Sequence, residues 1–422
     1  MSPDDKVEAP AASAATQPWF AAASRLSPTA RLLILCRAAR SVGQGALVAD
    51  FALYLAALHW NAAAMGAVYT GGLIVGASLT LLAGPLSDRI GRKPFLMGYG
   101  ASQVLAACLA LATTSPAWLA AASVLGAFGR SANGAAGPFG PVEQAWLASE
   151  IAERDFGPVY SLNAAVGYGG MAAGALFAAL PPLWHWAGTD AHEYQPLFLL
   201  PLIGAVLTLA LLIPARDRRQ PPMPESRSAR AAAAAAHRRE HGLLLRLMGI
   251  NMVNGLGAGI IGPFMAYWFH LRYGEGAAAI GPVMAGAFLL ASLGSLWTGW
   301  LTRQFGMTRA LVAMRLAGLI LLVALPFAPN YALAALCYIL NTACNRGTSG
   351  VRQAIGLRLV GARRRGLAAS LNTISMQIPR AIGPIAGGML LDAGFLILPM
   401  LLAAVLQTTY LVLYERMFRR FD

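Results

Sequence analysis

The sequence predicts an all-α protein that crosses a membrane many times, and three observations carry this prediction. Hydrophobic residues make up 57% of the 422-residue chain and charged residues only 12%, with a mean hydropathy of +0.57. A soluble domain carries about 25% charged residues, so a cytosolic enzyme is excluded, as are collagen-like, coiled-coil and disordered chains. The third observation is length, because twelve spans of about 20 apolar residues use about 240 positions and leave room for short loops.

Twelve apolar segments follow one another along the chain. They lie at about 38–59, 63–83, 95–113, 117–147, 158–182, 196–214, 247–270, 277–301, 310–328, 331–356, 367–391 and 394–414. The predicted domains are a cytoplasmic tail (1–30), an N-terminal six-helix bundle (31–214), a basic cytoplasmic central loop (215–246), a C-terminal six-helix bundle (247–415) and a second cytoplasmic tail (416–422). The poly-Ala run beside Arg230 fits either a helix on the membrane surface or a solvated linker.

The net charge of +14 is interpreted as a signal of membrane topology. Basic residues gather in alternate connections, including the central loop and the cluster Arg363 to Arg365, whereas the other connections carry mainly acids. Because cytoplasmic loops of membrane proteins collect Lys and Arg, both termini are predicted to be cytoplasmic in a cell (inner or plasma) membrane. Arg37 and Arg40 are assigned to the cytoplasmic interface. This account of the charge requires no nucleic-acid partner.

The two halves of the chain repeat each other. The segment from Gly84 to Gly91 (GPLSDRIG) recurs as GWLTRQFG from Gly299, an offset of 299 − 84 = 215 residues. A pattern that begins at Arg154 recurs at Arg363, an offset of 363 − 154 = 209 residues. Two pseudo-symmetric six-helix bundles, related by an axis along the membrane normal, are therefore predicted.

A short motif lies in the predicted turn between spans two and three, and Gly91 permits the tight reversal there. Its residues are Gly84, Asp88, Arg89, Gly91, Arg92 and Lys93. They resemble the loop signature of the major facilitator superfamily (MFS), over about residues 31–420. The resemblance implies the MFS fold, alternating access, a monomer, and a contact of Asp88 with the start of span eleven that latches one access state. Leu125-x-x-x-x-Arg130-x-x-x-Gly134 is similar to the span-four motif of the proton-coupled antiporters in this family.

Ionisable residues inside apolar spans are functional candidates, because a charge at mid-membrane costs at least about 2.5 kcal/mol. Asp50 and Glu143 are the candidate proton-coupling residues. The alternatives for Asp50 are that it is the structural partner of an arginine or that it reaches the outer interface. The alternative for Glu143 is that it sits at the cytoplasmic mouth and pairs with Arg352. The candidate substrate-cavity residues are Gln44, Arg130, Asn251, Asn254, Arg346 and Arg380. The first four of them could instead tie helices together. The segment Gly137 to Pro141 is predicted to break span four.

The sequence favours a secondary transporter, and the resemblance implies proton-coupled efflux of a small organic molecule by antiport. The alternative is a symporter or exchanger of an organic anion, because buried arginines outnumber buried acids. A membrane enzyme or a sensor is the remote alternative, since neither a clustered catalytic set nor a soluble module is present. No cofactor or metal is predicted, and a phosphate-binding loop for ATP is absent. The predicted partners are the substrate, protons and the lipid bilayer.

Overall fold

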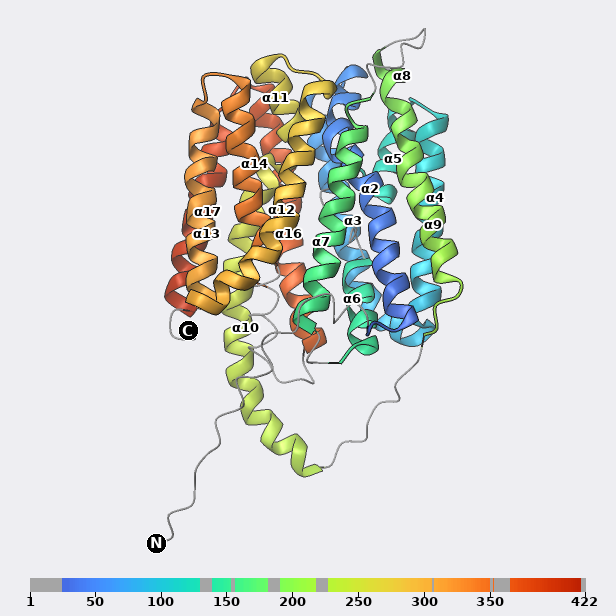
Figure 1. Ribbon diagram of the computed structural model, residues 1–422, viewed down its shortest axis with the longest axis vertical. Helices are drawn as coiled ribbons and strands as arrows, with labels where there is room; N and C mark the ends of the chain where they lie inside the picture. The colour runs from blue at the N-terminus through green and yellow to red at the C-terminus, as the bar shows by residue number, and fades with distance from the viewer. Residues whose placement is uncertain are drawn as a thin grey trace.

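The computed structural model describes residues 25–129, 139–152, 156–180, 190–217, 227–305, 307–349, 352 and 365–418. Nearly all of these residues are helical, and long helices run side by side from one end of the molecule to the other (Figure 1). Within the described part of the chain, eight helices are long and apolar enough to cross a membrane. The fold is therefore that of an all-α polytopic membrane protein, as predicted.

Each of the twelve predicted spans corresponds to a described helix or broken helix. The first half contains α2 (Pro28–Ala57), α3 (Ala62–Ile90), α4 (Arg92–Ala112), α5 (Pro116–Gly126) with α6 (Phe139–Glu150), α7 (Phe156–Phe177), and α9 (Leu199–Leu212) preceded by α8 (Asp190–Tyr194). The second half contains α10 (Arg227–Ile261) with α11 (Met265–Tyr273), α12 (Ala277–Phe305), α13 (Met307–Ala324), α14 (Tyr331–Gly347), α16 (Arg365–Asp392) and α17 (Leu398–Phe418). The two groups of helices lie on opposite sides of the molecule (Figure 1).

Span four is broken, but its first helix ends earlier than the sequence predicted. Helix α5 stops at Gly126, after which Ala127 and Gly129 have positive φ values of 58° and 66°. These left-handed conformations cannot continue a helix. Helix α6 begins at Phe139, inside the predicted break, with Pro141 in its first turn, where proline is tolerated. Residues 130–138, which include Gly137 and Pro138, lie outside the described residues.

Helix α10 extends well beyond the predicted start of span seven. The chain is helical without interruption from Arg227 through the poly-Ala run to Ile261. Alanine is the strongest helix former, so the helix of the span continues back into the segment predicted as a loop. In Figure 1 this first part of α10 projects past the end of the bundle. The predicted domain boundary at residue 247 falls inside this helix.

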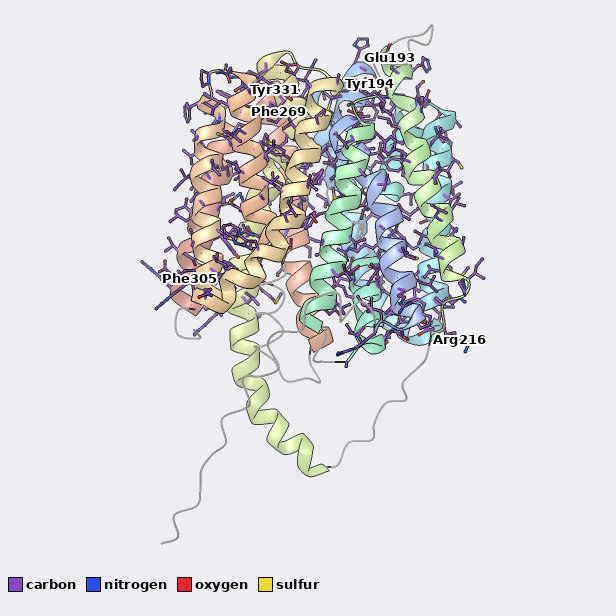
Figure 2. All side chains as sticks on the ribbon, in the orientation of Figure 1. Glu193, Tyr194, Arg216, Phe269, Phe305 and Tyr331 are labelled. Atoms are coloured by element: carbon purple, nitrogen blue, oxygen red, sulfur yellow. The ribbon has the colours of Figure 1, made fainter. Side chains whose placement is uncertain are left out.

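The two ends of the bundle are packed differently. The first turn of α2 and the last turn of α17 lie at the same end, which we call the termini end; the opposite end is called the far end (Figure 1). Figure 2 shows Phe269 and Tyr331 at the far end and Arg216 at the termini end. Toward the far end, buried side chains of both halves form one hydrophobic core, in which the rings of Tyr69 and Phe264 lie 5.6 Å apart.

At the termini end the described apolar residues form two separate cores. One contains only residues of the first half, such as Leu33 and Trp146. The other contains only residues of the second half, such as Leu311 and Tyr410. The halves are therefore joined by a common core toward the far end, whereas each half packs its own core at the termini end.

Candidate functional site

Asp50 is buried in α2 and has no hydrogen-bond partner among the described residues. Its exposed fraction is 1%, and both carboxylate oxygens are without a partner there. Tyr54 follows one helical turn later, is also 1% exposed, and its hydroxyl group likewise has no described partner. Because residues four apart share a helix face, both residues lie on the same face of α2. Burying a polar group without a hydrogen-bond partner is energetically costly.

The same face of α2 lines a small cavity within the first half. The cavity has a volume of about 30 Å³ and is bordered on α2 by Arg40, Gly43, Gln44 and Leu47. Its other walls come from α4, the two helices of broken span four, and α9. A space of this size holds about two water molecules. Leu47 precedes Asp50 by three residues, so the cavity ends about one helical turn from the buried carboxyl group.

Glu143 of α6 forms a buried ionic cluster with two arginines of α2. Its Oε1 atom lies 3.6 Å from Arg37 Nη1, and its Oε2 atom accepts a hydrogen bond from Arg40 Nη2. The exposed fractions of Arg37, Arg40 and Glu143 are 6%, 8% and 1%. The guanidinium group of Arg40 also lies 4.0 Å from the ring centre of Phe139. This arrangement ties α2 to α6 and stabilises both arginines within the bundle.

The assignment of Arg37 and Arg40 to the cytoplasmic interface did not predict that both side chains are buried against α6. Arginine is usually exposed, and the carboxylate that makes its burial possible here is more than one hundred residues away in sequence, at Glu143. The one available signal was the spacing of the two arginines, three residues apart on a single helix face.

A second cationic cluster lies in the other half, and sequence reasoning missed its buried arginine, Arg315. Arg315 of α13 is 7% exposed and donates hydrogen bonds to Asn254 Oδ1 at 3.1 Å and Thr348 Oγ1 at 3.3 Å. Its guanidinium group also lies 5.2 Å from the ring centre of Tyr410. Arg352, the repeat counterpart of Glu143, contacts the sulfur of Met376 at 3.8 Å. The chain has no acidic residue between Glu275 and Asp392, so spans eight to eleven supply these arginines with no carboxylate of their own.

The remaining predicted cavity residues occupy several helices. Asn251 of α10 is 3% exposed, and Gln44 borders the cavity of the first half. Arg346 of α14 places its guanidinium group 5.2 Å from the ring centre of Phe288. Arg380 of α16 is partly buried, and its backbone lies against Gly259 of α10. Arg130 lies outside the described residues, although Gly129, which precedes it, packs against the ring of Phe51.

The predicted motif lies at the tight junction of α3 and α4. Gly91 alone separates the two helices, and its φ of 101° favours glycine. The backbone N–H groups of Arg92 and Lys93 donate to Asp217 Oδ2 at 2.8 and 3.4 Å. Lys93 Nζ donates to the carbonyl oxygen of Ile213 at 2.6 Å, which fastens the junction to the end of α9. Gly84, Asp88 and Arg89 belong to the end of α3, and their side chains are outside the described set.

Paired bundles of membrane-spanning helices, with charged clusters buried inside them, define a multi-pass membrane transport protein. The family model of the Major Facilitator Superfamily matches residues 33–248, just over half of the 422 residues. The chain belongs to this superfamily and is a transporter of this type. An uncharacterized membrane protein of Saccharomyces cerevisiae is 23% identical over 322 residues, which cover 68% of this chain and 71% of the yeast protein.

Solved structures of transporters share the fold over almost the whole chain. A D-xylose–proton symporter matches with a TM-score of 0.71 and 13% identity, covering 91% of this chain and 96% of the symporter. The nucleoside transporter NupG matches with a TM-score of 0.69 and 14% identity, covering 93% of this chain and 100% of NupG. A bacterial homolog of the human lysosomal transporter Spinster matches with a TM-score of 0.69 and 14% identity, covering 96% of this chain and 98% of the homolog. At these identities the similarity shows the fold.

Proposed function

We propose that the protein is a proton-coupled secondary transporter that exports a small organic molecule by antiport. In this proposal it works as a monomer in the inner or plasma membrane, with both termini in the cytoplasm. Charge supports this orientation, because basic residues concentrate in the connections at the termini end and such residues mark the cytoplasmic side. The D-xylose–proton symporter with the same fold supports proton coupling as a property that this architecture can host.

The observation that carries the proposal is the burial of Asp50 without a described hydrogen-bond partner. An unpaired carboxylate in an apolar setting is costly, and it becomes neutral by binding a proton. The cavity beside Leu47 and Gln44 has space for water about one helical turn from this group, and in this proposal it lets the proton pass between Asp50 and the termini end. Asp50 therefore meets two requirements of a proton carrier. Its ionised form is energetically costly because no described group compensates the charge, and there is space for water nearby.

Glu143 is less suited to carry the proton, although the sequence analysis placed it beside Asp50 in that role. Arg37 and Arg40 both contact its carboxylate, and two cations stabilise the ionised form. We assign Glu143 the task of holding the two arginines inside the first half. Arg130, Arg346, Arg380, Asn251, Asn254 and Gln44 stay proposed contacts of the substrate, and Asp88 keeps its proposed role as a latch.

The packing of the two ends supports loading from the cytoplasm. Toward the far end both halves share one core, whereas at the termini end each half has its own. With the termini in the cytoplasm, this arrangement closes the outer side and leaves the inner side as the side that separates. A substrate would enter between the halves from the cytoplasm, and a proton taken up by Asp50 from the outside would then displace it there.

The test uses protein reconstituted in vesicles that contain a pH-sensitive dye. Compounds are first screened for those whose addition moves protons, and the flux of an active compound is then measured in Asp50→Asn. We expect flux driven by a pH gradient to fall at least about tenfold, the effect of a change of about 1.4 kcal/mol, while the thermal unfolding midpoint is retained. Glu275→Gln, which removes an acid near the far end, is the matched control and should transport normally. An undiminished pH-driven flux in Asp50→Asn would exclude this role.

A second candidate function, transport of an organic anion by symport or exchange, is favoured by one observation. Arg315 and Arg352 lie in a half whose spans eight to eleven contain no acidic residue. Arginine binds carboxylate and phosphate groups in a bidentate manner, so an anionic substrate would supply the missing charge. The vesicle screen separates the candidates, because anion uptake together with protons indicates symport and proton release against substrate indicates antiport.

A further inference from the structure

The carboxylate of Asp392 caps a helix that belongs to the other half of the molecule. Asp392 is the last residue of α16, and its Oδ1 and Oδ2 atoms accept hydrogen bonds from the backbone N–H groups of Ala62 and Ala63, at 2.7 and 2.8 Å. The side chain of Asn61 accepts from Ala64 N at 2.8 Å. The first turn of a helix has N–H groups without partners inside the helix. In α3 one of these groups, on Ala64, is satisfied by the helix's own cap residue, and two, on Ala62 and Ala63, are satisfied across the interface between the halves.

The hydrogen bonds of Asp392 stabilise the start of α3 rather than the end of α16. A negative charge at the C-terminus of a helix is unfavourable in the field of that helix, whereas the same charge at an N-terminus is favourable. The end of α16 is held in place by Gly394, with a φ of 81°, and by a hydrogen bond from Phe395 N to Leu390 O at 2.9 Å. This is the pattern of a Schellman ending, and it directs the carboxylate of Asp392 at the neighbouring helix.

The contact is part of the closed far end. Helices α3 and α16 run antiparallel, since Ala62 lies against Gly388 and Gly66 lies against Pro384. A side chain at Gly388 would collide with the carbonyl oxygen of Ala62, so glycine allows the approach that brings Asp392 within hydrogen-bond distance. The halves cannot separate at this end without moving Asp392 away from the start of α3.

We propose that Asp392 is a latch that stabilises the closed state of the far end during alternating access. Opening of that end breaks two charge-assisted hydrogen bonds, which are stronger than neutral ones, and leaves the first N–H groups of α3 to water. Loss of the latch therefore shifts the equilibrium toward the state in which the far end is open. The proposal rests on alternating access, which is part of the proposed function. It does not depend on which side of the membrane the far end faces.

The test measures how fast a buried cysteine in the far-end interface reacts with a membrane-impermeant maleimide. The reporter is Ala175→Cys on α7, because Ala175 is 0% exposed and lies against Gly281 of α12, a contact between the halves that does not involve α3. Fraying of α3 alone would not expose it. The background has Cys36, Cys108, Cys337 and Cys344 replaced by alanine. Gly276→Cys, which is exposed and has open space around it, reports whether the reagent reaches the far end.

We expect Asp392→Ala to speed labelling of the reporter by about five- to thirtyfold, the factor that corresponds to one to two kcal/mol. Asp392→Asn, which keeps one acceptor oxygen, should give a smaller increase, and Glu275→Gln should give none. Each variant must elute as monodisperse protein. When Gly276→Cys is introduced into each variant, it must react at the same rate as in the unsubstituted protein.

Unchanged labelling of the reporter in Asp392→Ala would overturn the latch, as would an equal increase in Glu275→Gln. If Gly276→Cys reacts only in inverted membranes, the proposed orientation is wrong. The labelling rates of the reporter with and without Asp392→Ala are then compared in inverted membranes, where they test the latch whatever the orientation. Proton coupling does not enter either readout, so failure at Asp50 and failure at Asp392 are distinguishable.

Discussion

The buried carboxyl groups of Asp50 and Glu143 have different surroundings, and for this reason we propose different roles for them. Glu143 is in contact with Arg37 and Arg40, so its charge is compensated inside the bundle. Asp50 has no such partner among the described residues and lies one turn from Tyr54. The first arrangement favours a fixed charge, whereas the second favours a group that gains and loses a proton.

At this scale we predict that Glu143→Gln strongly destabilises the protein. Removing one partner of a buried ionic cluster leaves uncompensated charge, and the expected loss is about 3–5 kcal/mol. The thermal unfolding midpoint in detergent measures it. The matched control is Glu150→Gln on the same helix, because Glu150 accepts a hydrogen bond from Ser27 at 2.8 Å in a partly exposed position. Its substitution should cost about 1 kcal/mol.

Replacement of the whole cluster provides the complementary measurement. Apolar residues at Arg37, Arg40 and Glu143 together leave no unpaired charge, so the triple variant should be more stable than Glu143→Gln. A triple variant that is as unstable as Glu143→Gln would show that packing, rather than charge, sets the cost.

At the scale of elements, glycine decides how closely helices of one half approach each other. On α7, side chains at Gly170 and Gly174 would collide with α2, at Ser41 and at the carbonyl oxygen of Val42. Gly169, next to Gly170, has no atom within 4 Å of the position where a side chain would begin. Within six residues, α7 therefore contains one glycine where a side chain would collide with α2 and one where a side chain has open space.

The matched pair gives the second prediction of stability. Gly174→Ala should lower the free energy of unfolding by about 1–3 kcal/mol, because overpacking forces the helices apart. Gly169→Ala should leave it unchanged or raise it by up to about 1 kcal/mol, because alanine favours the helix. Thermal unfolding of the two variants compares them directly, and equal midpoints would contradict the close contact of α2 and α7.

The sequence predicted the spans well because each one is a run of apolar residues, and the membrane requires such runs. It left the first part of α10 undecided between a helix and a linker, and helix propensity rather than hydrophobicity extends the element there. It also missed the cluster of Arg37 and the latch at Asp392. Both depend on partners far away in the chain, at Glu143 and at Ala62. The sequence around Asp392 indicates only an acidic residue in a connection between spans. Its role as a cap becomes visible only when α16 is placed against α3.

At the scale of the whole molecule, the shared core near the far end is what holds the two halves together in this state. Through rings such as Phe51, Tyr69 and Phe264, it joins α2 and α3 to the turn that precedes α11. Ser292 of α12 also donates to the carbonyl oxygen of Ala165 on α7 at 3.1 Å. The covalent connection between the halves is therefore a minor part of their association.

This predicts that cleavage of the connection leaves the halves together. A protease site placed between residues 218 and 226 should give two fragments that elute as one species in mild detergent, since the buried aromatic and aliphatic contacts are intact. Size-exclusion chromatography after cleavage measures the outcome. Fragments that separate without denaturant would show that the shared core is too weak to join the halves.

The uninterrupted course of α10 has a mechanical consequence. Eighteen residues separate Arg227 from Leu245, where the apolar span begins. At about 1.5 Å per residue they form a helical arm about 27 Å long. A tilt of the span by about 10° would move the tip of this arm by about 5 Å. If the halves rock as proposed, a fluorescent label near Arg227 should therefore register the motion as a displacement of this size.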